Sequence, residues 1–177
     1  MKLPTTNYSL QTHKGFTLIE LLLYVALSAI LLLSISIFLS TLLESRIKNQ
    51  VIAEVEQQGM QVMQIVVQTV RNADTINSPA TGVSAASLSI NTIVSGNNPT
   101  VFDLSGGAIR ITEGAGSAIV LTNSRLTASG LTFSNLSRAS TPGIVRIQFT
   151  LTAVNSTERN EYNYAKTFYG SASLRQP

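Results

Sequence analysis

The first pattern in the chain is an unbroken run of apolar residues near the amino terminus. Residues 16–43 contain one carboxylate, Glu20, and no lysine, arginine or histidine. A helix over these residues would reach about 42 Å, against a hydrocarbon core of roughly 30 Å in a bilayer. Helices in the core of soluble proteins are rarely apolar on every side. We therefore predict that residues 16–43 form a helix that spans a membrane.

After Leu43 the pattern changes to a single apolar stripe with helical spacing. Apolar or small residues recur three or four positions apart, at Ile47, Val51, Val55, Gly59, Val62, Val66 and Val70. Charged residues and glutamines fill the other positions, as in a helix half-buried against a domain. We predict that the helix continues over residues 44–74 and that the stripe is core rather than a seam for a partner. A glycine in a helix interior lowers the stability of the helix by roughly 1 kcal/mol. Gly59 therefore indicates either a close packing contact or a locally weak point of the helix.

Residues 75–177 have the alternation of strands. They are rich in Ser, Thr, Asn and Gly, and short runs alternate between apolar and polar residues. The clearest run is Val145–Val154. Ala108–Glu113 and Ala118–Asn123 flank a glycine-containing connection of hairpin length, which predicts a hairpin. Leu131–Leu136 and Glu161–Leu174 are further predicted strands.

The remaining predictions for this region concern an edge strand, a loop, a β-bulge and the packing of the sheet against the helix. Leu88–Val94 is predicted as an edge strand, and residues 95–107, with one proline and two glycines, as a loop. A shift in the alternation near Phe168 and Gly170 predicts a β-bulge. An antiparallel sheet with one apolar face needs a cover, which the amphipathic half-helix can supply. The predicted fold class is α+β, with a long N-terminal helix packed on a C-terminal antiparallel β-sheet.

Composition removes several classes of function. The chain has 177 residues, 12% of them charged, a net charge of +3 and no cysteine. Without cysteine there are no disulfides, thiolate zinc sites or cysteine nucleophiles. The one histidine, His13, precedes the apolar run, so the chain from residue 16 onward lacks a Ser-His-Asp triad and histidine metal ligands. No phosphate-binding glycine loop occurs. We expect no enzyme activity and no cofactor.

Neither the acidic nor the basic residues of the carboxy-terminal region form a recognisable site. Asp103 and Glu113 stand too far apart in sequence for a calcium-binding loop, so we interpret them as surface residues. The arginines and tyrosines are scattered rather than clustered on one element. We therefore do not expect nucleic-acid binding.

Glu20 is the one charge in the apolar run and needs an explanation. A carboxylate near the bilayer centre costs about 2.5–3.5 kcal/mol, and less near the interface. The simple interpretation is that Glu20 is protonated or reaches the membrane edge. The alternative is a cationic partner within an assembly. That cation would come from a chain end or another subunit, because the run contains no lysine or arginine.

The residues around Glu20 carry a family resemblance. Lys14-Gly15-Phe16-Thr17-Leu18-Ile19-Glu20-Leu21-Leu22 resembles the cleavage and methylation motif of type IV pilins and type II secretion pseudopilins. The resemblance implies that a prepilin peptidase recognises Lys14 and Gly15 and cuts after Gly15, and that Phe16 becomes the N-methylated terminus. It also implies that Glu20 is the filament-assembly carboxylate, which faces the freed amine of a neighbouring subunit. Methylation keeps the charge of that amine.

The resemblance also implies partners, and two departures from the family pattern bear on which type of pilin subunit this is. The implied partners are other pilin or pseudopilin subunits, an assembly-platform membrane protein and an assembly ATPase. Shaft-forming pilins often have a proline about 22 residues into the mature chain, where this chain has Ile37. The C-terminal cysteine pair common in major pilins is absent. Both departures favour a pseudopilin or minor pilin.

These observations divide the chain into four parts and lead to one functional expectation. The parts are a leader over 1–15, a transmembrane and assembly half-helix over 16–43, an amphipathic half-helix over 44–74, and a β-rich domain over 75–177. We expect a subunit of a type IV filament serving secretion, adhesion or DNA uptake. It would be stored as a single-pass protein of the cytoplasmic membrane with its β domain outside the cytoplasm, and assembled as a periplasmic or cell-surface filament.

Two other functions are alternatives to the filament subunit. The first is a single-pass, membrane-anchored binding module whose exported β domain does not polymerise. A mature terminus at Phe16 with one methyl group would favour the filament subunit, whereas an intact Met1 or a cut after Ser40 would favour the anchored module. The second, an anchored hydrolase, is disfavoured by the lack of histidine and cysteine after residue 15.

Overall fold

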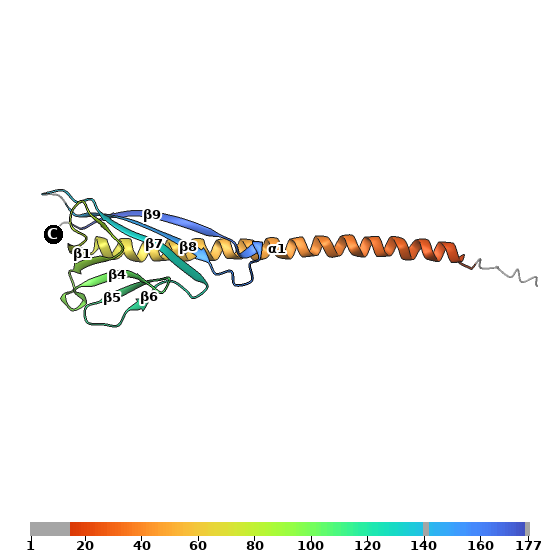
Figure 1. The fold of residues 1–177 in the computed structure, drawn as a ribbon, viewed down its shortest axis with the longest axis horizontal. Coiled ribbons are helices and arrows are strands. Elements are labelled where there is room, and N and C mark those ends of the chain that lie inside the picture. Colours follow the sequence, from red (N-terminus) through yellow and green to blue (C-terminus); the bar gives the residue numbers. More distant parts are fainter. Residues whose placement is uncertain (1–14, 140–141, 176–177) are drawn as a thin grey trace, which may run out of the picture. The chain divides into compact units, whose positions relative to one another are not determined.

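The computed structural model describes residues 15–139 and 142–175. The chain divides into two compact units, Met1–Leu43 and Glu44–Pro177. One helix, α1 (Leu18–Arg71), begins in the first unit and ends in the second (Figure 1). The predicted recognition residue Lys14 and the leader before it lie outside the described residues.

In the N-terminal unit the described chain is helical and apolar on every side. From Leu21 to Leu43 every side chain is exposed, and most of them are large and apolar. Among the described residues, α1 is the one helix long and apolar enough to cross a membrane. The helix expected from the apolar run is therefore present, and its surface is of the kind that lipid or other apolar helices cover.

The C-terminal unit contains the second part of α1 and two antiparallel sheets. In spatial order, the five-stranded sheet consists of β1 (Ala73–Ser78), β3 (Leu88–Thr92), β4 (Thr100–Ser105), β5 (Ala108–Glu113) and β6 (Ile119–Val120). The four-stranded sheet consists of β2 (Ser84–Ala85), β7 (Leu126–Asn135), β8 (Ile144–Ala153) and β9 (Ala165–Ser173). Two short 3-10 helices cover Ser95–Asn97 and Asn160–Tyr162. The α+β class is as predicted, with two sheets where one was expected.

The predicted apolar stripe is the buried face of α1 in this unit. Its buried residues are Val51, Val55, Gly59, Val62, Val66 and Val70, and Ile47 is half-buried. Figure 1 shows β7, β8 and β9 running beside this part of the helix. The alternation predicted for β8 is also confirmed, because Val145, Ile147, Phe149, Leu151 and Ala153 are buried. Each large apolar side chain that is fully buried contributes about 1.5–3 kcal/mol.

Two glycines allow α1 and β9 to approach each other closely. A Cβ on Gly59 would overlap the ring of Phe168, and a Cβ on Gly170 would overlap the sulfur of Met63. The interpretation of Gly59 as a close packing contact is therefore confirmed. The predicted β-bulge near Phe168 and Gly170 is wrong, since β8 and β9 pair without a register shift. The glycine faces the helix at a normal strand position, and its missing side chain only resembles a break in the alternation.

The predicted loop over residues 95–107 is also wrong. It contains β4, which pairs with both β3 and β5, and whose Thr100 and Phe102 are fully buried. The proline precedes the strand, and Gly106 and Gly107, both with positive φ, form the two-residue turn between β4 and β5. Because β4 lies beside it, β3 is an interior strand rather than the predicted edge strand.

Several element boundaries differ from those predicted. The helix ends at Arg71 rather than at residue 74, because the buried Ala73 already belongs to β1. The hairpin of β5 and β6 is confirmed, although β6 is shorter than predicted. β7 begins earlier than predicted, at Leu126, and has its own register shift against β8 between Ser129 and Thr132.

Candidate functional site

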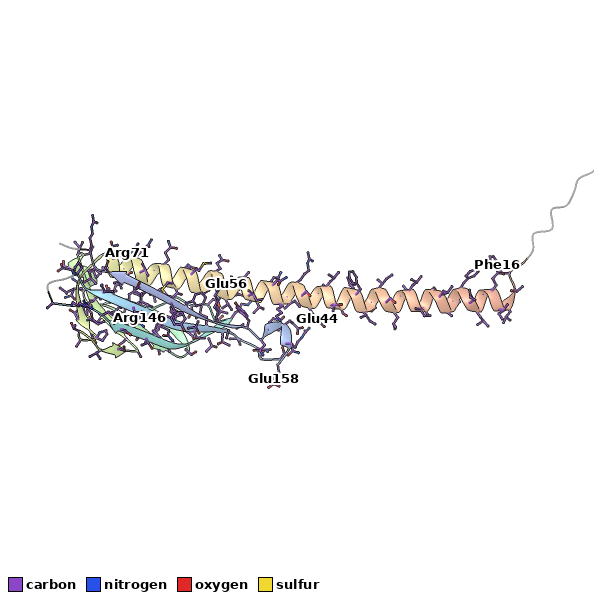
Figure 2. All side chains as sticks on the ribbon, turned by 90° about the horizontal axis from the view of Figure 1, so that it is seen from above. Phe16, Glu44, Glu56, Arg71, Arg146 and Glu158 are labelled. Carbon is purple, nitrogen blue, oxygen red and sulfur yellow. The ribbon has the colours of Figure 1, made fainter. Side chains whose placement is uncertain are left out.

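The predicted cleavage bond lies just outside the helix. Gly15 and Phe16 have no regular secondary structure and both are exposed, Phe16 by 75%. A Cβ on Gly15 would meet no atom within 4 Å. Figure 2 shows Phe16 at the amino-terminal end of α1. The peptide bond between the two residues is therefore open to a peptidase.

Thr17 caps the first turn of the helix. Its Oγ1 accepts a hydrogen bond from the Glu20 backbone N–H at 3.3 Å, and its carbonyl oxygen accepts one from the Leu21 N–H at 3.2 Å. A threonine three positions before a glutamate is the capping-box pattern. The cap places Glu20 in the first turn, where the helix dipole favours a carboxylate. This role of Thr17 is not among the predictions made from the sequence, although the spacing signals it.

Tyr24 contacts Phe16 and Glu20, two of the residues to which the family resemblance assigns a role. Its hydroxyl donates to Glu20 Oε1 at 3.2 Å, across one helical turn. Its ring meets the ring of Phe16 edge-on, with centroids 6.1 Å apart. Sequence reasoning missed Tyr24, whose i, i+4 spacing from Glu20 was the available signal. Within the described residues, Glu20 forms no ion pair.

In the C-terminal unit, Asp103 is already paired. Arg110, its register partner on β5, donates to both of its carboxylate oxygens, at 2.9 and 2.7 Å. The hydrogen bond to Asp103 raises the pKa of Arg110 above its ordinary value. Among the described residues, no group of three or more histidines, cysteines, aspartates and glutamates could hold a metal ion. Asp103 is thus a sheet-surface residue, as interpreted from the sequence.

Two carboxylates of α1, on either side of its buried stripe, attach the helix to β9 and to the connection between β6 and β7. Glu56 accepts from Lys166 Nζ at 2.6 Å, and Glu54 accepts from Asn123 Nδ2 at 3.0 Å (Figure 2 labels Glu56). The hydrogen bond and charge of Lys166 lower the pKa of Glu56, and the hydrogen bond and charge of Glu56 raise that of Lys166. Arg125 lies 3.5 Å from Glu54. These contacts hold the helix to the rest of the unit.

The amino-terminal residues of the chain match a family model. Residues 10–36 match the prokaryotic N-terminal methylation motif, the hallmark of type IV pilin and pseudopilin precursors. The chain thus carries the amino-terminal motif of type IV pilin-like precursors. The match includes Gly15, Phe16 and Glu20, and it also covers Thr17 and Tyr24. Comparisons with curated proteins and with solved structures gave no match.

The motif indicates how a precursor that carries it is processed and what general role it has. It implies processing by a prepilin peptidase and assembly with other pilin subunits. It also indicates a structural subunit rather than an enzyme. The C-terminal unit lies beyond the matched residues, so its role has to be argued from its own contacts.

Proposed function

We propose that this pilin-like precursor is a subunit of a type IV filament, cut after Gly15, N-methylated at Phe16 and polymerised through the helix over residues 16–43. The observation that carries the proposal is the arrangement at the start of α1. An exposed, non-helical bond lies one helical turn before Glu20, the single charged residue of the apolar run over residues 16–43.

The charge balance explains why cleavage and assembly belong together. Cutting after Gly15 creates an ammonium group at Phe16, and methylation leaves it charged. In a bundle of these helices, that ammonium and Glu20 of a neighbouring copy would offset each other's desolvation. Removing one partner of a buried ion pair costs about 3–5 kcal/mol, because the other charge stays unpaired. Glu20 is therefore tolerable in a membrane-stored subunit and favourable in a polymer.

Within type IV filaments, we place the chain among pseudopilins or minor pilins. The helix continues without a break through Ile37, where shaft-forming pilins often have proline. The chain also has no cysteine for a C-terminal disulfide. Secretion, adhesion and DNA uptake are the uses open to such a filament.

The proposal includes a location and partners. Before assembly the chain is a single-pass protein of the cytoplasmic membrane with its β domain outside the cytoplasm. The peptidase reads Lys14 and Gly15, of which Lys14 lies outside the described residues. An assembly-platform membrane protein acts on the mature helix, and an assembly ATPase acts on it indirectly.

The amino terminus of the mature protein tests this proposal. The chain is expressed in cells with a prepilin peptidase, extracted from the membrane and analysed by intact mass and amino-terminal sequencing. We expect a terminus at Phe16 carrying one methyl group. Cells without the peptidase are the control and should keep Met1. An intact Met1 in peptidase-containing cells, or a cut after Ser40, would instead favour a membrane-anchored binding module.

A further inference from the structure

Glu20 differs from the other described residues of the N-terminal unit in being partly covered. Every residue from 15 to 43 is exposed except Glu20, which is half-buried. The side chain of Tyr24 contacts the Glu20 carboxylate and supplies part of this cover. Tyr24 itself is 52% exposed. The carboxylate is therefore partly covered by an aromatic residue of its own helix before any other copy of the chain is present.

The hydroxyl of Tyr24 is used differently from the other hydroxyls of the apolar run. It donates to a side chain, at 3.2 Å from Glu20 Oε1. The serine and threonine hydroxyls that form hydrogen bonds in this run instead bond to backbone groups within four residues, and they belong to Thr17, Ser28, Ser34, Ser40 and Thr41. A polar group in an apolar setting needs a hydrogen-bond partner. The Tyr24 hydroxyl, at the far end of its ring, finds that partner in Glu20.

The hydrogen bond from Tyr24 occupies only one oxygen of the Glu20 carboxylate. An ionised carboxylate accepts hydrogen bonds at both oxygens. In the described parts of the chain, no hydrogen bond or ion pair reaches Oε2 of Glu20. Holding a flexible side chain in one rotamer before it binds removes part of the entropic cost of binding. One oxygen thus orients the carboxylate, and the other stays available to a cation.

Tyr24 also contacts the residue that would supply this cation. The ring of Phe16, which precedes the helix, meets the ring of Tyr24 edge-on with centroids 6.1 Å apart. Phe16 has no regular secondary structure, so the ring contact limits where its backbone nitrogen lies. Contacts that build an open filament are heterologous, so each copy would offer its amine to one neighbour and its Glu20 to another. Tyr24 contacts both of these residues within one chain.

We propose that Tyr24 is a positioning residue for filament assembly, which holds Oε1 of Glu20 and the ring of Phe16 so that Oε2 accepts the ammonium group of an adjoining copy. The inference rests on the proposed function, because the Phe16 ammonium forms only after cleavage at Gly15. The hydroxyl is the group on which the orientation of the carboxylate depends. The ring alone would cover Glu20 without fixing the direction of either oxygen.

Tyr24→Phe tests this role, because it removes the hydroxyl and keeps the ring. We expect the variant to insert and to be cleaved as the wild type is, and the amount of sheared filament to fall by at least about tenfold, as for the loss of one hydrogen bond to a charged group. Tyr169→Phe, the same change on an exposed tyrosine of β9, is the matched control and should assemble normally. Normal assembly of Tyr24→Phe would overturn the inference.

The alternative role of Tyr24 is that of an anchor at the membrane interface, where tyrosine is enriched. An anchor acts on insertion, whereas a positioning residue acts on assembly after insertion is complete. Membrane fractionation of Tyr24→Phe separates the two steps. A loss of membrane-inserted protein as large as the loss of filament would overturn the positioning role in favour of the anchor.

Solid-state NMR of the unassembled mature chain in lipid bilayers tests the hydrogen bond directly. The glutamates carry ¹³C-labelled carboxylates, and Glu20→Ala assigns the Glu20 signal. Tyr24→Phe should move the Glu20 signal and leave that of Glu56, whose own tyrosine partner is Tyr164 at 3.4 Å, where it is. Tyr164→Phe should have the opposite effect. A Glu20 signal that is the same with and without the Tyr24 hydroxyl would overturn the inference.

The outcomes separate this inference from the proposed function. The NMR comparison needs no filament, so an unchanged Glu20 signal overturns the role of Tyr24 and leaves the filament subunit standing wherever wild-type filaments form. A changed signal with normal assembly of Tyr24→Phe has the same consequence. A wild-type chain that is cleaved but forms no filament overturns both proposals. A changed signal together with the loss of filament supports the inference.

Discussion

The ring of Phe168 on β9 lies against Gly59 on α1, at a place where any Cβ would overlap it. One helical turn further on, the relationship is reversed, because the Met63 side chain lies against Gly170 on β9. Large residues thus face glycines in both directions across this interface. Phe168 also stacks on Phe149, with ring centroids 5.4 Å apart, which limits how far the ring can shift.

This packing predicts that Gly59→Ala destabilises the protein. Overpacking costs about 1–3 kcal/mol, whereas the better helix propensity of alanine returns only about 1 kcal/mol. We expect the free energy of unfolding to fall by about 1 kcal/mol, measured by denaturant unfolding of the full chain in detergent. In a Phe168→Leu background the same substitution should cost less, because the two residues are in contact. A Gly59→Ala variant more stable than the wild type would contradict the packing.

The ion pair of Glu56 and Lys166 predicts a pH dependence. Folding lowers the pKa of Glu56 below its ordinary value of 4.5. The ionised carboxylate therefore contributes fully to the stability of the fold above pH 4.5, and this contribution is lost as the pH falls through the lowered pKa. Folding raises the pKa of Lys166 above its ordinary value of 10.5. The ammonium group therefore contributes fully to the stability of the fold below pH 10.5, and this contribution is lost as the pH rises through the raised pKa. The pair therefore stabilises the unit between these limits.

Lys166→Met should reveal this window in urea unfolding. We expect it to lower stability at neutral pH, and the difference from the wild type to shrink at acid pH and in high salt. The matched control is Lys48→Met, on an exposed residue that forms no ion pair in the described parts of the chain. If the stability difference between Lys166→Met and the wild type stays constant from neutral to acid pH, the loss of stability comes from packing rather than from charge.

The sequence was informative where local pattern decides the structure. The valine stripe of α1 and the alternation of β8 are visible in the sequence because burial of one face dictates them. β4 was missed because the proline before it and the glycines after it were interpreted as a loop, although they only delimit the strand. The partition into two sheets depends on pairing between distant segments, which no local pattern encodes.

The same contrast holds at the candidate site. Gly15, Phe16 and Glu20 follow from the motif, because their spacing is specific. Thr17 and Tyr24 act through a cap and a hydrogen bond that depend on where the helix begins. The spacing of both residues from Glu20 is compatible with these contacts, but spacing alone does not establish that the helix begins at Leu18 and that Thr17 caps it.

Glu20→Ala should separate membrane insertion from assembly. Insertion should be unchanged, because a carboxylate is removed from an apolar helix. Incorporation into filaments should fall by at least about a hundredfold, since an unpaired buried ammonium costs about 3–5 kcal/mol. Membrane fractionation and the amount of sheared filament measure the two steps. Glu44→Ala is the matched control, on an exposed carboxylate just beyond the apolar run, and should assemble normally.

The most direct measurement is the distance between the Phe16 amine of one copy and the Glu20 carboxylate of another. Filaments are prepared from a mixture of two differently labelled proteins, one with a ¹⁵N-labelled Phe16 amine and one with a ¹³C-labelled Glu20 carboxylate. Solid-state NMR magnetisation transfer then reports only contacts between copies. The account predicts transfer at ion-pair range, about 4 Å between nitrogen and oxygen. Filaments that form without any such transfer would contradict it.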